Sequence, residues 1–335
     1  MKLYMDNGYV NISAILSNNI PFNFIVGGRA TGKTYTTLKT VVENGIKFLL
    51  LRRTQAQADL INKPDFSPFK SLNRDCGWDI RSTPITKYNA AFYSGDDGDV
   101  IGYSAALSTI SNMRGFDASD VELLIYDEFI PEAHERPIKN EGAAFFNAYE
   151  TINRNRELSG RNPLQVICLA NANDIANPIF LELGLVSKVA SMRKKHKNIF
   201  VDKKRGLAVY LLDGSPISDS KRDTALYRLT HGSEFQQMAL NNSFVDTDNL
   251  KTVHRPLIEF RPVVGVGELT VYQHKGDGRY YVSRHRSGTC PEYATGPSDL
   301  EQFTAAYGWL KVEQLENNID YEEIVGKILL TKYLK

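Results

Sequence analysis

The residues best suited to chemistry begin with a glycine-rich segment, GGRATGKT, at residues 27–34. It fits the pattern G-x-x-x-x-G-K-[ST], in which backbone N–H groups and a helix N-terminus cradle a polyphosphate. The apolar run at 22–26 predicts a strand before it, and residues 33–43 predict a helix after it. A glycine turn beside a solvated lysine is the plain structural alternative. The expected phosphate-binding residues are Gly27, Gly28, Arg29, Ala30, Thr31, Gly32, Lys33 and Thr34.

Two carboxylates end a second strand-like segment, VELLIYDE, at residues 121–128. In phosphate-loop enzymes the first carboxylate at the tip of such a strand orders the magnesium shell, so Asp127 and the Thr34 hydroxyl are the candidate metal site. Neighbouring strand residues point in different directions, which leaves Glu128 free to act on the attacking water as general base or water-positioning group. The Asp-Glu pair is weak evidence by itself. Together with the glycine-rich segment, in which Lys33 would reach the β- and γ-phosphates, it predicts hydrolysis of a nucleoside triphosphate.

Polar residues also follow two other predicted strands. Residues 46–51 form an apolar run that ends in Arg52-Arg53, where an arginine could sense phosphate, pair with an acidic catalytic residue or contact DNA. Residues 165–170 form a similar run, and Asn171 after it is a candidate contact to the γ-phosphate or the water. A solvated strand end and a turn-forming asparagine are the respective alternatives.

Arg154 is a candidate for action across a subunit boundary. Residues 140–159 predict a helix with an apolar stripe that comprises Phe145, Tyr149 and Ile152. Arg154 lies about 900°, or half a turn, from Phe145 at the helical period, and we therefore expect it to point away from its own core. It could stabilise the charge on a phosphoryl group in a neighbouring subunit, although helix ends also favour cations electrostatically. Arg156 lies nearer the stripe and is the weaker candidate.

The strand tips can meet only if the strands run in parallel, because parallel strands bring their carboxyl ends to one edge of a sheet. We predict an α/β fold for residues 1–205: a P-loop NTPase with a mostly parallel sheet and an extra strand between the phosphate-loop strand and the acidic strand (ASCE type). An inserted hairpin is expected over residues 87–106 and a loop over residues 62–77. Residues 206–245 read as a small linker domain.

The remaining residues, 246–335, predict an α+β domain. Three antiparallel strands are expected at 257–260, 269–273 and 280–284, followed by helices, the last over residues 320–332. This arrangement is similar to a reduced ribonuclease-H-like domain. A two-metal nuclease needs several converging carboxylates, whereas the predicted strands offer only Glu259 and Glu268. We therefore expect a vestigial domain without nuclease activity.

The composition is ordinary for a globular protein, with 42% hydrophobic and 24% charged residues. No apolar run is long enough to span a bilayer and no signal-peptide core follows the first residues, so we expect a cytoplasmic protein without a membrane partner. The net charge of +1 excludes a uniformly basic surface. Residues 188–205, however, hold eight Lys or Arg against one acid, and could either neutralise DNA phosphates or form a solvated surface.

The order of these motifs resembles that of the DNA-packaging motor ATPases of phi-29-like small tailed phages. The resemblance rests on GGRATGKT, LLIYDEF, FFNAYETINRNRE and VICLANAND, which follow the family's order at similar spacing. It implies the phosphate-loop role for Lys33 and Thr34, and the magnesium and catalytic roles for Asp127 and Glu128. The further roles it implies are a finger acting across subunits for Arg154, a basic residue acting in trans for Arg114, coupling to the acidic switch for Arg52, and the sensor after the strand for Asn171. The chain departs from the family at Gln55, where relatives can carry a lysine proposed to face DNA.

The resemblance also implies what such a protein works with. Its members use ATP and Mg²⁺ to pump double-stranded DNA, and they form a homo-oligomeric ring, usually a pentamer, on the portal (connector) of an empty procapsid. Hydrolysis would then take place at subunit boundaries, in the host cytoplasm, on a transiently attached motor. Some relatives dock on a packaging RNA, which makes RNA a further candidate partner. Two alternatives remain: a large terminase with an active nuclease, and a nucleotide-gated DNA-binding scaffold with little turnover.

Overall fold

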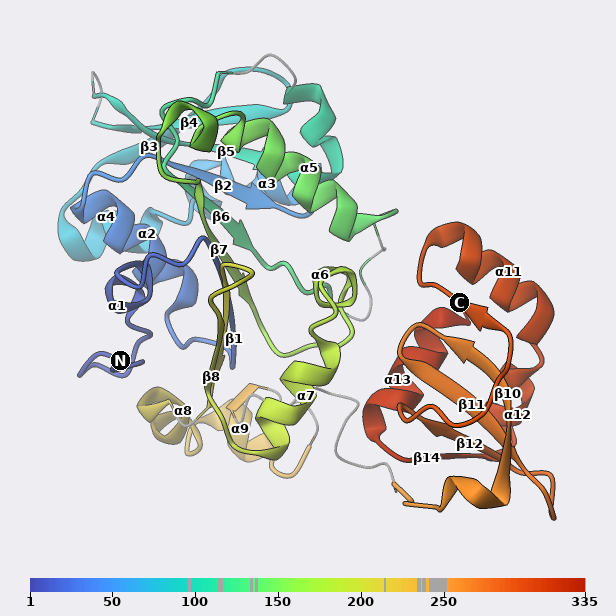
Figure 1. Ribbon diagram of the computed structural model, residues 1–335. Coiled ribbons are helices and arrows are strands. Elements are labelled where there is room, and N and C mark those ends of the chain that lie inside the picture. The colour runs from blue at the N-terminus through green and yellow to red at the C-terminus, as the bar shows by residue number, and fades with distance from the viewer. Residues whose placement is uncertain are drawn as a thin grey trace. The chain divides into compact units, whose positions relative to one another are not determined.

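A computed structural model describes residues 1–95, 98–113, 117–132, 135, 138–213, 215–233, 236, 239–240 and 252–334. The chain divides into two units, residues 1–245 and residues 246–335, and each has a sheet of its own (Figure 1). Within the described ranges, no helix has both the length and the apolar character needed to cross a membrane.

The first unit is built on a nine-stranded sheet of order β3-β4-β5-β2-β6-β7-β1-β9-β8. Its strands are β1 (Phe22–Gly27), β2 (Phe48–Arg52), β3 (Ile80–Pro84), β4 (Asn89–Ser94), β5 (Val100–Ala106), β6 (Leu123–Asp127), β7 (Gln165–Ala170), β8 (Ile199–Asp202) and β9 (Leu207–Leu212). The run from β5 to β9 is parallel throughout, whereas β3, β4 and β8 pair antiparallel with their neighbours. The predicted α/β fold with a mostly parallel sheet is therefore confirmed.

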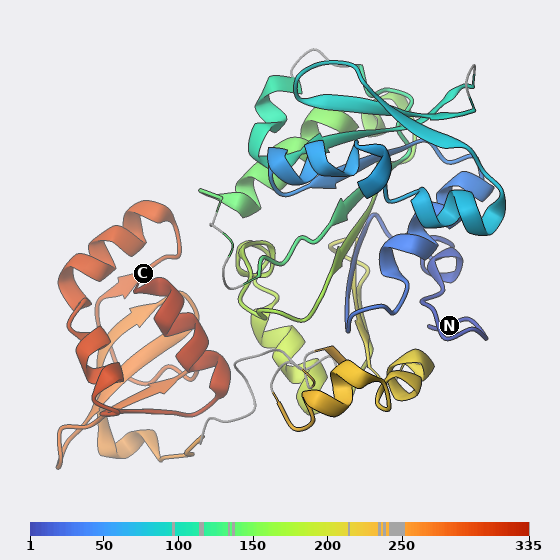
Figure 2. The ribbon, with the colours of Figure 1, turned by 180° about the vertical axis from the view of Figure 1, so that it is seen from behind.

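Helices cover both faces of this sheet (Figures 1 and 2). They are α1 (Ile12–Leu16), α2 (Lys33–Glu43), α3 (Gln55–Ile61), α4 (Lys70–Cys76), α5 (Glu141–Asn153), α6 (Pro178–Glu182), α7 (Val186–Lys194), α8 (Pro216–Lys221) and α9 (Ala225–Leu229). On one face, Leu38 and Val41 of α2 join a buried cluster with Ile25 of β1. On the other, Phe24 of β1 packs edge-on against Phe180 of α6. Adjacent residues of β1 thus serve opposite faces, as alternation along a buried strand requires.

Two stretches before the acidic strand differ in part from the expected pattern. The prediction of a loop over residues 62–77 is wrong in its second half, because Lys70–Cys76 forms α4, whose Leu72 is buried. The prolines that suggested a loop precede this helix, and Gly77 ends it at φ 68°. The inserted hairpin is confirmed as β4 and β5, and β3 extends it by one strand that the sequence did not predict.

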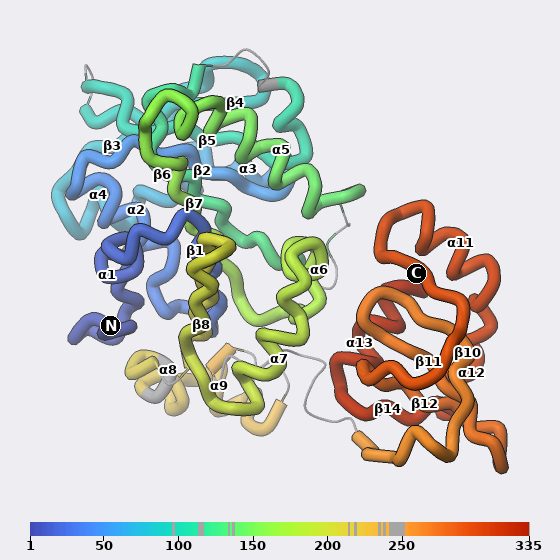
Figure 3. Tube along the Cα trace, in the orientation of Figure 1, coloured from blue at the N-terminus to red at the C-terminus, as the bar shows by residue number. Residues whose placement is uncertain are grey.

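The segment assigned to a linker begins inside the large sheet. Residues 207–212 form β9, which is fully buried and pairs in parallel with β1 along its length. The chain then continues into α8 and α9, as the tube in Figure 3 shows. A continuous apolar run before Asp213-Gly214 was the signal for a strand of the sheet. A separate linker domain within the rest of 206–245 stays a prediction.

The second unit has a five-stranded sheet of order β13-β10-β11-β12-β14. Its elements are β10 (Phe260–Val266), β11 (Leu269–His274), β12 (Tyr280–Ser283), β13 (Glu292–Tyr293), β14 (Ile319–Tyr321), α11 (Pro297–Tyr307), α12 (Leu310–Leu315) and α13 (Ile324–Tyr333). Three antiparallel strands are present as β10 to β12. The bounds predicted for the first, 257–260, are wrong, because Leu257–Glu259 forms a 3-10 helix and β10 starts only at Phe260. The helix predicted over 320–332 is wrong at its start, because β14 precedes α13 and places Asp320 on a strand.

Candidate active site

The register of the parallel strands brings four strand tips level with one another. β7 lies between β1 and β6, with Val26 opposite Ala170 and Leu169 opposite Asp127. On the other side of β6, Leu51 of β2 lies opposite Tyr126. The predicted extra strand between the phosphate-loop strand and the acidic strand is therefore present. The loops that follow β1, β2, β6 and β7 all leave the same edge of the sheet.

The phosphate loop curls between β1 and α2. Ala30 and Gly32 have φ values of 60° and 78°, and Thr31 Oγ1 donates to the Gly28 carbonyl at 3.1 Å. Gly32 is required there, because a Cβ on it would lie 2.6 Å from the Tyr9 ring. The loop leads directly into the N-terminus of α2, which is the arrangement that binds phosphate groups.

Lys33 lies inside this loop and meets the tip of β7. Its Nζ donates to the carbonyl oxygens of Gly27 at 3.0 Å and Gly28 at 2.8 Å, and to Asn171 Oδ1 at 3.1 Å. Burial lowers the pKa of Lys33 to about 8, and the charge of Asp127 opposes this shift. Two residues that are 138 positions apart in the sequence therefore meet at the phosphate loop.

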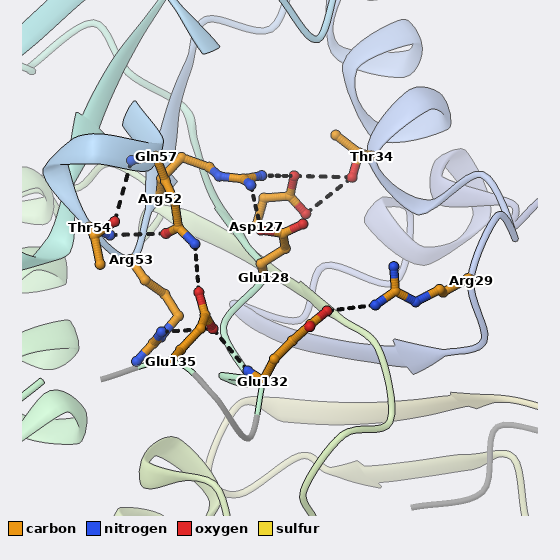
Figure 4. Close-up of polar contacts among 10 residues, drawn as sticks. All are labelled: Arg29, Thr34, Arg52, Arg53, Thr54, Gln57, Asp127, Glu128, Glu132 and Glu135. Atoms are coloured by element: carbon orange, nitrogen blue, oxygen red, sulfur yellow. Dashed lines mark hydrogen bonds and ion pairs between the residues drawn. The ribbon is translucent and has the colours of Figure 1, made fainter. Parts of the chain in front are cut away.

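Thr34 and Asp127 form a pair suited to magnesium. Thr34 Oγ1 lies 3.1 Å from both carboxylate oxygens of Asp127, which is buried at the end of β6 (Figure 4). Hydroxyl and carboxylate oxygens are the hard ligands that Mg²⁺ takes when it also binds nucleotide phosphates. The residue types and their position beside the phosphate loop therefore fit the ion.

Arg52 binds both carboxylates of the acidic strand. Its Nη1 donates to Asp127 Oδ2 at 2.7 Å and its Nη2 to Glu128 Oε2, as Figure 4 shows. Glu128 has a φ of 60°, and its side chain is half exposed. Partial burial raises the pKa of Glu128, an effect that Arg52 opposes and Asp127 reinforces. Of the roles considered for Arg52-Arg53, the structure shows Arg52 paired with acidic residues.

Arg29 joins the phosphate loop to two other parts of the chain. Its Nη2 lies 2.6 Å from Glu132 Oε1 in the segment after β6, and its backbone N–H donates to the Ala239 carbonyl at 3.1 Å. A Cβ on Gly28 would lie only 2.5 Å from that same carbonyl oxygen. The phosphate loop is therefore in direct contact with Ala239, within the range assigned to a linker.

Arg154 lies outside the cluster formed by these strand tips. α5 ends at Asn153, and Arg154 follows it with a φ of 49°, so the helical period that predicted its direction does not apply there. Its side chain is half exposed and lies 3.6 Å from Asp117. Arg156 is buried and donates to the carbonyls of Ser119 and Val121, which is a structural role. Arg114 lies outside the described residues.

A second set of charged residues lies behind the site, and the sequence did not predict it. Arg53 is fully buried and donates through Nε and Nη2 to the two carboxylate oxygens of Glu141, at 2.7 and 2.9 Å. Its Nη1 also lies 3.0 Å from Glu135. The sequence signal was Arg53, the residue directly after β2, but its partner is 88 positions away and carries no local pattern.

Comparisons with known proteins bear on this site. A family model described as podovirus DNA encapsidation protein (Gp16) matches residues 5–284. The DNA packaging protein of Bacillus phage PZA is 26% identical over 303 residues, which cover 88% of this chain and 84% of that protein. The DNA packaging protein of Bacillus phage phi29 is 28% identical over 242 residues, or 71% of this chain and 66% of that protein. A chain of the bacteriophage Phi-29 viral genome packaging motor assembly shares the fold, with a TM-score of 0.65 at 20% identity over 98% of this chain and 99% of that one.

Proposed function

Because the chain belongs to the family of podovirus DNA encapsidation proteins, we propose that it packages viral DNA by hydrolysing ATP. The substrate would be double-stranded DNA and the destination a preformed procapsid. The observation that carries this proposal is the convergence of Lys33, Thr34, Arg52, Asp127, Glu128 and Asn171 at one edge of the parallel sheet. A protein that only bound nucleotide would need the phosphate loop, but not a base beside it.

Each residue at this edge of the sheet would have its own role in hydrolysis. Lys33 and the N-terminus of α2 would hold the phosphates, and Thr34 with Asp127 would hold Mg²⁺, which supplies positive charge to the β- and γ-phosphates. Glu128 would accept a proton from the attacking water. Asn171 would contact the γ-phosphate or that water, and Arg52 would keep Glu128 beside the metal ligand until substrate is in place.

Arg154 would act on the site of a neighbouring subunit. α5 is 13 residues long and begins at Glu141, next to Tyr126 of the acidic strand, so its far end lies roughly 20 Å along the helix from that point. A single arginine side chain cannot cover that distance to its own Asp127. Its exposure beyond the helix end instead suits a contact across a subunit boundary in a ring, for which a pentamer on the portal is the proposed form.

DNA would meet basic side chains outside the phosphate site. The exposed members of the basic run lie on the first and last turns of α7, on the residues before β8 and on the turn after it. They are Lys188, Lys194, Lys195, Lys197, Lys203, Lys204 and Arg205. Such groups bind backbone phosphates without reading bases. We further propose that Arg114 is a basic residue that acts in trans. Packaging RNA is a candidate partner, and the proposed place of action is the host cytoplasm.

Phosphate release by the purified protein, with procapsids and duplex DNA present, tests the proposal. We expect Mg²⁺-dependent turnover that rises with DNA and procapsids, together with DNA that becomes protected from added nuclease. Lys33→Ala should abolish both signals, since the ammonium that holds the phosphates is lost. Failure of the wild-type protein to bind Mg·ATP, or binding with no turnover in the assembled motor, would contradict the proposal and favour a nucleotide-gated scaffold.

A further inference from the structure

The acidic strand is held from two sides by consecutive arginines, Arg52 at the end of β2 and Arg53 directly after it. Arg52 reaches forward to Asp127 and Glu128, whereas Arg53 turns away from them, and Figure 4 shows the two guanidinium groups pointing apart. Arg53 instead pairs with Glu141 in the first turn of α5. Both side chains of this second pair are fully buried, at 0% exposure each.

Glu141 is in turn bound to the acidic strand itself. Tyr126, the residue before Asp127, donates its hydroxyl to Glu141 Oε1 at 2.9 Å. Both carboxylate oxygens of Glu141 are thus in use, with Arg53 on each and Tyr126 on one.

Net stability is a poor explanation for this arrangement. Replacing a buried ion pair by apolar side chains of similar volume is often neutral or stabilising, because two desolvated charges recover little more than their burial costs. Directional hydrogen bonds are what the pair supplies and apolar side chains would not. Here those bonds fix the residue that immediately precedes the metal ligand and the general base.

We propose that Glu141, oriented by its buried partner Arg53, is a positioning residue for hydrolysis that acts through the Tyr126 hydroxyl on the tip of the acidic strand. Glu141 would contact neither nucleotide nor metal. It would set the backbone from which Asp127 and Glu128 project, while Arg52 sets their side chains. The inference rests on the proposed ATPase function and adds to it a second layer of residues behind the site.

Tyr126→Phe tests the link by removing one hydroxyl and leaving the Arg53–Glu141 pair intact. We expect kcat for ATP hydrolysis to fall about tenfold, while KM and the affinity for Mg·ATP stay unchanged. Small misplacements of reacting groups can lower a rate by roughly a hundredfold, so a loss of this size fits an indirect effect. Tyr210→Phe is the matched control. Tyr210 is equally buried, on β9 beside β1, and its hydroxyl bonds to Asn18 and Asn23. The Tyr210→Phe protein should lose as much thermal stability as Tyr126→Phe but keep the wild-type kcat.

The double variant Arg53→Leu/Glu141→Leu tests the pair by removing both of its fully buried charges together. It should lose at least as much kcat as Tyr126→Phe, and adding Tyr126→Phe to it should cause no further loss, because both changes cut the same link. Tyr126→Phe with the kcat of the Tyr210→Phe control would overturn the proposal, whether or not the double variant folds. A wild-type protein without ATPase activity would instead refute the proposed function.

Discussion

Asp127 and Glu128 are neighbours in sequence with different surroundings, and this difference suits the two roles proposed for them. Asp127 is buried between the Thr34 hydroxyl and Arg52, as a metal ligand should be. Glu128 is half exposed, and partial burial raises its pKa, with Arg52 opposing and Asp127 adding to the shift. Two carboxylates in unlike environments can therefore act as ligand and base in the same site.

Glu128→Gln should separate binding from hydrolysis. The amide keeps the size of the side chain but cannot accept a proton, so kcat should fall by about 100- to 10,000-fold while Mg·ATP affinity changes little. Steady-state phosphate release and nucleotide titration measure the two quantities. Glu122→Gln, at the exposed start of the same segment, is the control and should hydrolyse normally. Equal turnover in the two variants would remove Glu128 from the mechanism.

Lys33 should make nucleotide binding sensitive to alkaline pH. Its pKa in the free protein is lowered to about 8, and only the protonated form attracts phosphate, so above that pH binding must take up a proton. Mg·ATP affinity should therefore be steady below pH 7 and fall by up to about tenfold per unit above pH 8. Calorimetry across pH 6.5 to 9.5 measures this, and Lys33→Arg, which stays charged, should bind without that slope. A flat profile for the wild-type protein would contradict the assignment.

At the scale of elements, α5 is fixed at both ends by buried arginines. Arg53 holds Glu141 at its start, and Arg156 beyond its end donates to backbone carbonyls that include those of Ala118 and Val121. The same helix separates the acidic strand from Arg154. A rigid α5 would therefore keep a constant distance between the active site of a subunit and the Arg154 that the same subunit extends to its neighbour.

Arg156→Met should weaken this anchor without touching the site. It leaves the buried carbonyls of Ala118 and Val121 without that donor, so the free energy of unfolding should fall by about 1–3 kcal/mol. Urea denaturation measures the change. Arg161→Met is the control, because Arg161 is exposed and donates to the Ser119 carbonyl only from the surface. A loss no larger than that of the control would show that Arg156 is not an anchor.

The sequence predicted the elements whose signals are local and missed those that depend on distant partners. The phosphate loop and the buried strands each carry their pattern within a few residues, and the structure has both. Arg154 is exposed, as predicted, but the helical period was not the reason, because the helix stops one residue earlier, where the backbone turns to a positive φ. Glu141 was missed because its meaning comes from Arg53 and Tyr126, which reach it only through the packing of α5 on the sheet.

At the scale of the molecule, two acids of the second unit are paired with arginines. Glu268 lies 2.9 Å from Arg284, and Asp320, which the sequence had placed on a helix, lies 2.7 Å from Arg255 and 3.2 Å from Arg279. Within the described part of the chain, no group of three or more His, Cys, Asp or Glu is placed to hold a metal. Plasmid DNA incubated with the protein and Mg²⁺ or Mn²⁺ should therefore stay uncut. Nicking would instead support a large terminase with a working nuclease.

The ring itself can be tested by mixing two inactive variants. Glu128→Gln lacks the base but keeps Arg154, whereas Arg154→Ala keeps the base and, since alanine also carries a Cβ, adds no backbone strain at φ 49°. If Arg154 acts in trans, an Arg154→Ala subunit beside a Glu128→Gln subunit has one complete site. Random rings from equal amounts should then have roughly one active site in four, although each variant alone is inactive. Phosphate release in the assembled motor measures this recovery. A mixture as inactive as its parts would mean that the finger and the base must belong to one chain, which the length of α5 argues against.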